Sequence, residues 1–205
     1  MSRKTLTVAI CTLPVRLQHL QRLLTNLEQQ IDKFNLQGRV EVLYLGDTKT
    51  LTVGAKRNKL AQIATGDYIT FVDDDDTLNS IYLIELIKAI DRYPNIDVVN
   101  FNVEISINGA EGKPVLYSKE HIQDKNLKHA YLRIPNHLMC FKRKLVLSTP
   151  YLDISFEEDA KWAKAVLPKI TNEVNIDRIL YFYNCNHATS ETLPAELRKK
   201  LLANV

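Results

Sequence analysis

The chain has 205 residues, of which 45% are hydrophobic and 25% are charged. These proportions are typical of a soluble globular protein, and they exclude a disordered or fibrous chain. Its 27 basic and 24 acidic residues give a formal net charge of +3, which is too weak to require nucleic acid or an anionic membrane as a partner.

The first half of the chain alternates between strand and helix patterns. The segment "TLTVAIC" is rich in β-branched residues, and apolar residues then recur at helical spacing from Leu17 to Phe34. Asn79 or Ser80 is the expected N-cap of a later helix. We expect strands at residues 5–11, 39–45, 67–72 and 97–105, and helices at 17–34, 54–65 and 81–93. Such alternation predicts right-handed βαβ units, hence an α/β fold with a mostly parallel sheet covered by helices on both faces.

The pattern is looser from about residue 106 onward. The segment "NGAEGKP" predicts a turn and residues 118–130 are mostly polar. A strand is expected at "HLMCF", residues 137–141, and a helix over residues 156–167 that ends at Pro168. We interpret the whole chain, residues 1–205, as a single domain.

Four consecutive aspartates, Asp73 to Asp76, follow the apolar run that ends in Val72. Two such charges at close range repel by up to about 4 kcal/mol at an effective dielectric near 20. In parallel sheets ligands bind beyond the carboxyl ends of the strands, which makes this run a candidate site. The alternative is a solvated turn in which Asp76 or Asn79 caps the next helix. A Mg²⁺ or Mn²⁺ ion shared with a diphosphate would relieve the repulsion.

The segment "VGAKRNKLAQIATGDYITFVDDDD", residues 53–76, resembles the nucleotide-sugar-binding half of family 2 glycosyltransferases of the GT-A fold, including their D-x-D motif. "TVAICTLPVR", residues 7–16, resembles the first strand and loop of that family. The resemblance implies a Rossmann-like sheet, a nucleotide-sugar donor with UDP as the expected nucleotide, and Mn²⁺ or Mg²⁺ as the cofactor. It assigns residues 1–105 to the donor and residues 106–205 to the acceptor.

The resemblance also assigns roles to individual residues. It implies that Thr12 and Arg16 face the nucleotide and that Asp47 contacts the base. It places Arg57 near the diphosphate. It implies that Asp73 and Asp74 help to bind the donor and that Asp75 is the direct metal ligand. The family usually has a pair of acids at the end of the second strand, whereas this chain has Gly46 and Asp47.

A second acidic cluster, Glu157 to Asp159, begins the helix expected at "SFEEDAKWAKAVLP". Acids in a first helical turn complement the helix dipole, which is the purely structural explanation. The family resemblance instead implies that Asp159 is the general base of an inverting transfer. An acceptor hydroxyl is a poor nucleophile, so a carboxylate within hydrogen-bond reach must take its proton as it attacks the sugar.

Three further segments of the second half resemble parts of the same family. In "ILYFYNCNHATSE" the resemblance implies that His187 lies near the metal or the diphosphate, although a lone histidine is often an ordinary surface residue. In "PNHLMCFKRKLVL" it implies that Asn136 and His137 lie near the acceptor pocket, whereas "KRK", residues 142–144, is expected to be a solvated basic edge. The final "PAELRKKLLANV" predicts an amphipathic helix that packs on the domain or on a partner chain.

Cysteines and hydropathy indicate where the protein works. The chain has three cysteines, Cys11, Cys140 and Cys185, and no two of them form a C-x-x-C motif. An odd number of widely spaced cysteines indicates neither a disulfide framework nor a zinc site. No apolar run approaches the roughly 18 residues of a membrane helix, and the N-terminal apolar stretch is too short for a signal peptide. We therefore expect a cytoplasmic protein whose acceptor is a saccharide, a glycolipid or another hydroxyl compound; a nucleic-acid acceptor is possible but not indicated.

Other functions remain open at this point. "DDDDT" also satisfies the D-x-D-x-T motif of haloacid dehalogenase phosphatases, in which Asp73 would be a covalent nucleophile, although that class carries the motif on its first strand. A nucleotidyltransferase would require a glycine-rich loop, which "CTLPVR" lacks. A non-catalytic nucleotide-sugar-binding module is the third alternative.

Overall fold

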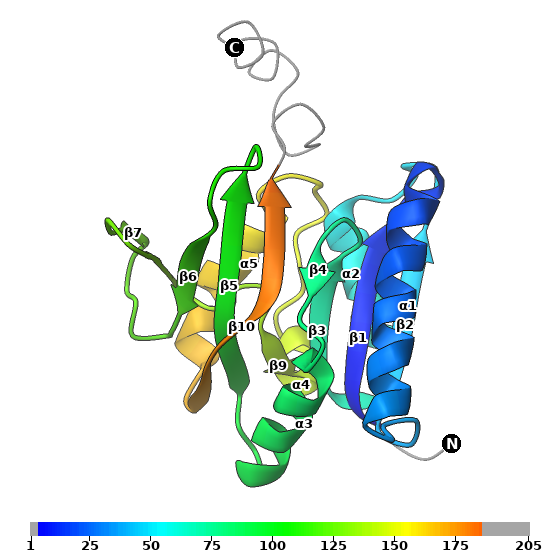
Figure 1. The fold of residues 1–205 in the computed structure, drawn as a ribbon, viewed down its shortest axis with the longest axis horizontal. Helices are drawn as coiled ribbons and strands as arrows, with labels where there is room; N and C mark the ends of the chain where they lie inside the picture. The colour runs from blue at the N-terminus through cyan, green and yellow to red at the C-terminus, as the bar shows by residue number, and fades with distance from the viewer. Residues whose placement is uncertain (1–3, 186–205) are drawn as a thin grey trace, which may run out of the picture.

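The structure is a computed structural model that describes residues 4–185. A mixed β-sheet crosses the molecule (Figure 1). Its strands lie in the order β2 (Val40–Gly46), β1 (Lys4–Thr12), β3 (Gly66–Asp73), β9 (Cys140–Lys142), β5 (Val98–Ile107), β6 (Lys113–Tyr117), β8 (Tyr131–Arg133) and β7 (Lys125–Asn126). In addition, β10 (Glu173–Cys185) pairs with β4 (Thr77–Leu78) and with β5. The three longest strand pairings are parallel: β1 pairs with β2, β1 also pairs with β3, and β5 pairs with β10. The predicted α/β class with a central, largely parallel sheet is confirmed.

The first half forms the elements that its periodicity predicts. They are β1 (Lys4–Thr12), the 3-10 turn η1 (Pro14–Arg16), α1 (Leu17–Lys33), β2 (Val40–Gly46), α2 (Val53–Ile63), β3 (Gly66–Asp73), β4 (Thr77–Leu78), α3 (Tyr82–Arg92) and β5 (Val98–Ile107). Pro14 occupies the first turn of η1, where its missing N–H costs no hydrogen bond. Helices α1 and α3 pack together on one face of the sheet, and α2 lies on the other face (Figure 1).

The start of α3 differs from the prediction, because neither Asn79 nor Ser80 is its N-cap. The N-cap is Ile81, which has no side-chain capping bond, while Asn79 Oδ1 accepts a hydrogen bond from its N–H. The buried Gln30 of α1 accepts a hydrogen bond from the N–H of Leu83 at 2.9 Å. A residue about fifty positions earlier therefore satisfies the helix terminus, and local sequence could not indicate it.

The second half adds mostly short elements and one long strand, β10 (Glu173–Cys185). They are β6 (Lys113–Tyr117), β7 (Lys125–Asn126), β8 (Tyr131–Arg133), β9 (Cys140–Lys142), α4 (Arg143–Leu147), α5 (Glu158–Val166), the 3-10 turn η2 (Leu167–Lys169) and β10 (Glu173–Cys185). Helices α4 and α5 lie with α2 on the face opposite α1 (Figure 1). No helix within residues 4–185 is both long enough and apolar enough to cross a membrane.

Two predictions for this half are wrong in detail. The strand expected over residues 137–141 covers only Cys140–Lys142, because the turn before it is fixed by Asn136, whose carbonyl and side-chain oxygens accept hydrogen bonds from the N–H groups of Met139 and Leu138. The segment 142–144 is not simply a solvated edge. Arg143 is half-buried and donates to two carbonyl oxygens at the end of α2.

Candidate active site

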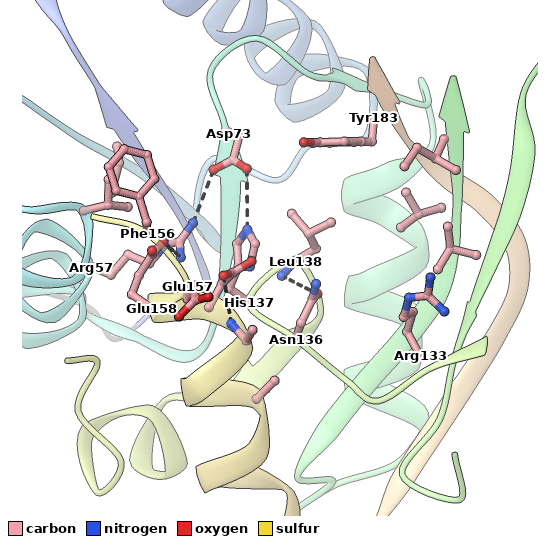
Figure 2. Close-up of a pocket in the computed structure, with 18 of the residues that line it drawn as sticks. Arg57, Asp73, Arg133, Asn136, His137, Leu138, Phe156, Glu157, Glu158 and Tyr183 are labelled. Atoms are coloured by element: carbon pink, nitrogen blue, oxygen red, sulfur yellow. Dashed lines mark hydrogen bonds and ion pairs between the residues drawn. The ribbon is translucent and has the colours of Figure 1, made fainter. Parts of the chain in front are cut away.

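A cavity of about 1200 Å³ lies beyond the carboxyl ends of β1 and β3, where the sheet was predicted to bind a ligand. Both halves of the chain line it, and Figure 2 shows side chains from each half that point into it. Its polar lining includes Thr12, Arg16, Lys56, Arg57, Asp73, Asp74, Asp75, Arg133, Asn136, His137, Glu157, Glu158 and Asp159. Most of the predicted donor residues and the predicted base therefore line the same cavity.

The fold itself supplies partners for the central acids of the aspartate run. Asp74 is 2% exposed, accepts a 2.6 Å hydrogen bond from the Thr12 hydroxyl and forms a 2.7 Å ion pair with Arg16. The same guanidinium reaches Asp75 at 2.5 Å. Burial raises the pKa of Asp74, and Thr12 and Arg16 oppose that rise. A single cation from the loop after β1 thus holds two neighbouring carboxylates together.

The last acid of the run, Asp76, has a structural role. It is buried and accepts a 2.5 Å hydrogen bond from the hydroxyl of Tyr181, which also accepts a bond from the N–H of Asp73. Arg22 of α1 donates to the backbone oxygens of Asp75 and Asp76. Protein donors therefore offset the repulsion within the run, and no metal ion is needed to explain it.

Arg57 lies between Asp73 and the second acidic cluster. Its guanidinium is 2.7 Å from Glu158 and 3.5 Å from Asp73, and the residue is 3% exposed. The rings of Phe71 and Tyr151 lie 5.8 and 5.5 Å from its guanidinium carbon, within the range of cation–π attraction. Burial raises the pKa of Glu158, and the charge of Arg57 opposes this rise. Arg57 thus joins the two acidic clusters.

Asp159 lies beside this group, at the start of α5. Its carboxylate is 38% exposed and reaches within 3.7 Å of His137, whose other ring nitrogen is 3.5 Å from Asp73. Burial alone would raise the pKa of Asp73, but the hydrogen bond and charge of His137 and the charge of Arg57 hold it well below its usual range. Both acidic clusters therefore contact the same histidine.

Aromatic packing fixes the position of α5. The indole N–H of Trp162 donates to the Thr149 carbonyl at 2.6 Å, and its ring stacks on Tyr151 with centroids 4.7 Å apart. The helix follows Glu157, which has a left-handed backbone with φ of 61°. This conformation is uncommon outside glycine and turns the chain sharply just before Asp159. Core packing thus determines where the acidic cluster faces.

Asp47 lies at the edge of this arrangement and does not line the cavity. Its carboxylate pairs with the buried Lys56 and accepts hydrogen bonds from the Thr50 hydroxyl and the Leu51 N–H. The bond from Lys56 is the main reason why its pKa lies well below the usual value. Lys56 also donates to the Thr12 carbonyl at 3.0 Å, so Asp47 orders the loops around the cavity. Its contact with a base stays a prediction.

The structure thus brings most predicted site residues together. The predicted residues that line the cavity are Thr12, Arg16, Arg57, Asp73, Asp74, Asp75, Asn136, His137 and Asp159. His187 lies outside the described residues. The sequence reasoning did not identify Lys56, Glu158 or Tyr181 as partners of these groups. Lys56 and Glu158 are sequence neighbours of predicted site residues, and this proximity could have identified them. Nothing in the sequence indicated a role for Tyr181.

The carboxylates that face the cavity are suitable ligands for a hard divalent cation. Residues 4–185 contain no group of three or more His, Cys, Asp or Glu side chains arranged to hold a metal ion by themselves. Mg²⁺ is commonly held by one or two carboxylates together with substrate phosphates. Asp73 and Asp75 line the cavity with side chains 34% and 48% exposed, so they fit a cation that arrives with a diphosphate.

Solved structures of TarS from S. aureus share this fold. TarS 1-349 in complex with UDP-GlcNAc matches with a TM-score of 0.64 and 14% identity over 98% of this chain and 71% of that chain. TarS 1-349 in complex with UDP matches with a TM-score of 0.64 and 15% identity over 98% of this chain and 70% of that chain. The match to the structure of S. aureus TarS has a TM-score of 0.63 and 14% identity over 98% of this chain, which spans 42% of that longer chain.

The sequence itself matches the family model Glycosyl transferase family 2 over residues 24–148. No curated protein sequence matches the chain. The family match contains the aspartate run and Arg57, while Thr12, Arg16 and Asp159 lie outside it. This assignment sets aside the phosphatase and nucleotidyltransferase alternatives. Because the match covers more than half of the chain, the protein belongs to glycosyl transferase family 2 and is a glycosyltransferase, as the motif in residues 53–76 predicted.

Proposed function

We propose that this glycosyltransferase moves a sugar from a UDP-sugar to an acceptor hydroxyl with inversion at the anomeric carbon, assisted by Mn²⁺ or Mg²⁺. One observation carries the proposal: a cavity of suitable size joins the aspartate run to Asp159, a half-exposed carboxylate that can act as a base. The structures of TarS with UDP and UDP-GlcNAc, which share this fold, support the choice of UDP.

The donor occupies the side of the cavity formed by the first half of the chain. Thr12 ends β1, Arg16 ends η1, and both line the cavity, where they would face the nucleotide. Arg16 and Arg57 would provide positive charge for a diphosphate. Asp73 and Asp75 would hold the divalent cation, which supplies charge that neutralises the departing diphosphate. Asp74 maintains this wall through its bonds to Thr12 and Arg16.

Asp159 acts on the acceptor. Its carboxylate takes the proton of the acceptor hydroxyl, the hydroxyl oxygen bonds to the anomeric carbon, and the bond from that carbon to the diphosphate breaks with its electron pair leaving on UDP. Arg57 stabilises the developing charge through the electrostatic field of the site. Attack opposite to the leaving group in one step gives inversion.

The acceptor lies against the second half of the chain. Tyr117, Tyr131, Tyr183 and Arg133 line this part of the cavity, and aromatic faces with a guanidinium suit a saccharide or a glycolipid head group. In this proposal residues 1–105 hold the donor and residues 106–205 hold the acceptor within one domain of a cytoplasmic enzyme.

A thermal-shift panel of nucleotide sugars, with and without Mn²⁺, tests the donor and the metal together. A ligand at 100 times its dissociation constant adds about 2.7 kcal/mol to stability, which corresponds to roughly 5–10 °C for a chain of this size. We expect UDP-sugars to raise the melting temperature only weakly without Mn²⁺. The variant Asp75→Asn should retain the weak shift and lose the increment from Mn²⁺; an unchanged increment would refute the metal assignment.

The variant Asp159→Asn separates binding from chemistry. We expect it to bind UDP as the parent protein does and to lose about 10²- to 10⁴-fold in turnover, the usual contribution of a general base. Turnover is measured as UDP release from the sugar that the panel identifies. Unchanged turnover would show that another group is the base, and absence of UDP binding by the parent chain would exclude the proposed donor.

A further inference from the structure

His137, like Arg57, contacts both acidic clusters. Its Nε2 atom lies 3.5 Å from Asp73 Oδ2 and its Nδ1 atom lies 3.7 Å from Asp159 Oδ2. Figure 2 shows the imidazole pointing from its loop toward Asp73, with Glu157 and Glu158 at the same end of the cavity. The imidazole is therefore placed between the donor-binding acids and the proposed base.

The imidazole is buried, and one of its nitrogens lacks a hydrogen bond. The side chain of His137 is only 7% exposed, and within the described residues Nδ1 has no hydrogen-bond partner. A buried polar atom left in this state costs about 1–3 kcal/mol, so a partner is expected in the working enzyme. The nearest acidic oxygen is that of Asp159, at a distance slightly too long for a bond. Catalytic hydrogen bonds are often long without substrate and shorten in the complex.

The backbone around His137 is fixed to the central sheet. Its carbonyl oxygen accepts a hydrogen bond from the N–H of Phe71 at 3.3 Å, and the next carbonyl, that of Leu138, accepts one from the Thr70 hydroxyl at 3.0 Å. Both donors belong to β3, the strand that ends in Asp73. The imidazole is thus supported by a rigid element, as a group that orients another side chain must be.

We propose that His137 is a positioning residue that orients Asp159 through Nδ1 and Asp73 through Nε2, so that one side chain aligns the base with the donor. The inference rests on the proposed function. The two ring nitrogens face the two carboxylates, so the position of the imidazole sets where the base lies relative to the donor-binding acid.

Two variants separate the two contacts, because each amide copies one ring nitrogen. The amide of asparagine occupies the position of Nδ1, so His137→Asn keeps a donor for Asp159 and removes the one for Asp73. The longer glutamine reaches the position of Nε2, so His137→Gln keeps a donor for Asp73 and removes the one for Asp159. His137→Leu removes both donors and keeps an apolar side chain of similar size in the buried position.

The test measures UDP affinity by calorimetry and slow hydrolysis of a UDP-sugar as UDP release, with water in place of the acceptor. We expect His137→Gln to retain the UDP affinity and to lose roughly 10- to 100-fold in kcat, and His137→Asn to retain kcat and to lose a similar factor in UDP affinity. His137→Leu should lose both. The exposed His129, mutated to Asn, is the matched control and should change neither quantity.

The results for the three His137 variants either support or overturn the inference. Opposite effects of the Asn and Gln variants on kcat and affinity support the inference, provided that thermal unfolding shows all variants folded. Equal effects of the two variants on both quantities, or full activity of His137→Leu, overturn it and leave His137 a packing residue. If the parent chain neither binds nor hydrolyses any UDP-sugar, the proposed function fails first, and the inference fails with it.

Discussion

Removal of the Arg57 side-chain charge should strongly destabilise the protein. Arg57→Met keeps an unbranched side chain between Phe71 and Tyr151 and removes the partner of the buried Glu158. At 2.7 Å and an effective dielectric near 20, the lost attraction is roughly 6 kcal/mol before desolvation is considered. Breaking a buried ion pair from one side typically costs about 3–5 kcal/mol, and we expect a loss in that range.

The loss should depend on pH in a defined direction. Burial raises the pKa of Glu158 above its ordinary value of 4.5, and without Arg57 it will rise further. The folded state then binds a proton more tightly than the unfolded state, so stability is greatest below the unfolded pKa and falls as pH rises through the folded one. The deficit of Arg57→Met should therefore shrink as the pH is lowered toward 4.5.

Urea denaturation followed by fluorescence measures this loss, because the chain has one tryptophan, Trp162, buried beside the site. The double variant Arg57→Met with Glu158→Gln is the matched control, since it also removes the stranded charge. We expect it to recover much of the stability and to remove the part of the pH dependence that comes from Glu158. A loss below about 1 kcal/mol, or no recovery in the double variant, would refute the view that Arg57 neutralises a buried carboxylate.

Two further predictions concern the supports of the site. Tyr181→Phe removes the hydrogen bond to the last carboxylate of the aspartate run and should cost about 1.5–3 kcal/mol in urea unfolding; a neutral effect would show that this carboxylate is satisfied elsewhere. Gly54→Ala should cost about 1–3 kcal/mol, because the new methyl group would overlap the Leu152 carbonyl oxygen, whereas Gly38→Ala, which meets no atom within 4 Å, should be close to neutral. Equal effects of the two alanines would contradict the steric explanation.

Local patterns in the sequence predicted most of the first half. Runs of apolar and β-branched residues located β1, β2 and β3, and the helical spacing of apolar residues located α1, because these segments supply much of the core. The position of four aspartates after a buried strand was enough to place a site at the carboxyl end of the sheet. The resemblance to the family was recognisable from the segment that ends in these aspartates, because the donor-side motif consists of contiguous residues. The family match over residues 24–148 includes this segment.

The order of the strands was decided only by the tertiary structure. The alternation predicted a mostly parallel sheet without an order of strands, and in the structure the short antiparallel β9 pairs with both β3 and β5 and separates them. A strand was expected here at residues 137–141, but three residues carry too little pattern to indicate which strands they pair with. This insertion carries the loop with His137 to the end of β3, beside Asp73.

The sequence also did not indicate which side chains pair with the acidic residues of the site. Arg57 and Glu158 lie 101 positions apart, and Asp76 and Tyr181 lie 105 apart. The order of residues showed that four adjacent carboxylates needed compensation, for which a metal ion was the predicted source. The fold itself also provides arginine and tyrosine partners, because strand pairing and helix packing bring distant segments to one edge of the sheet. The sequence alone therefore located the two acidic clusters, and the tertiary structure decided that they line one cavity and which side chains neutralise them.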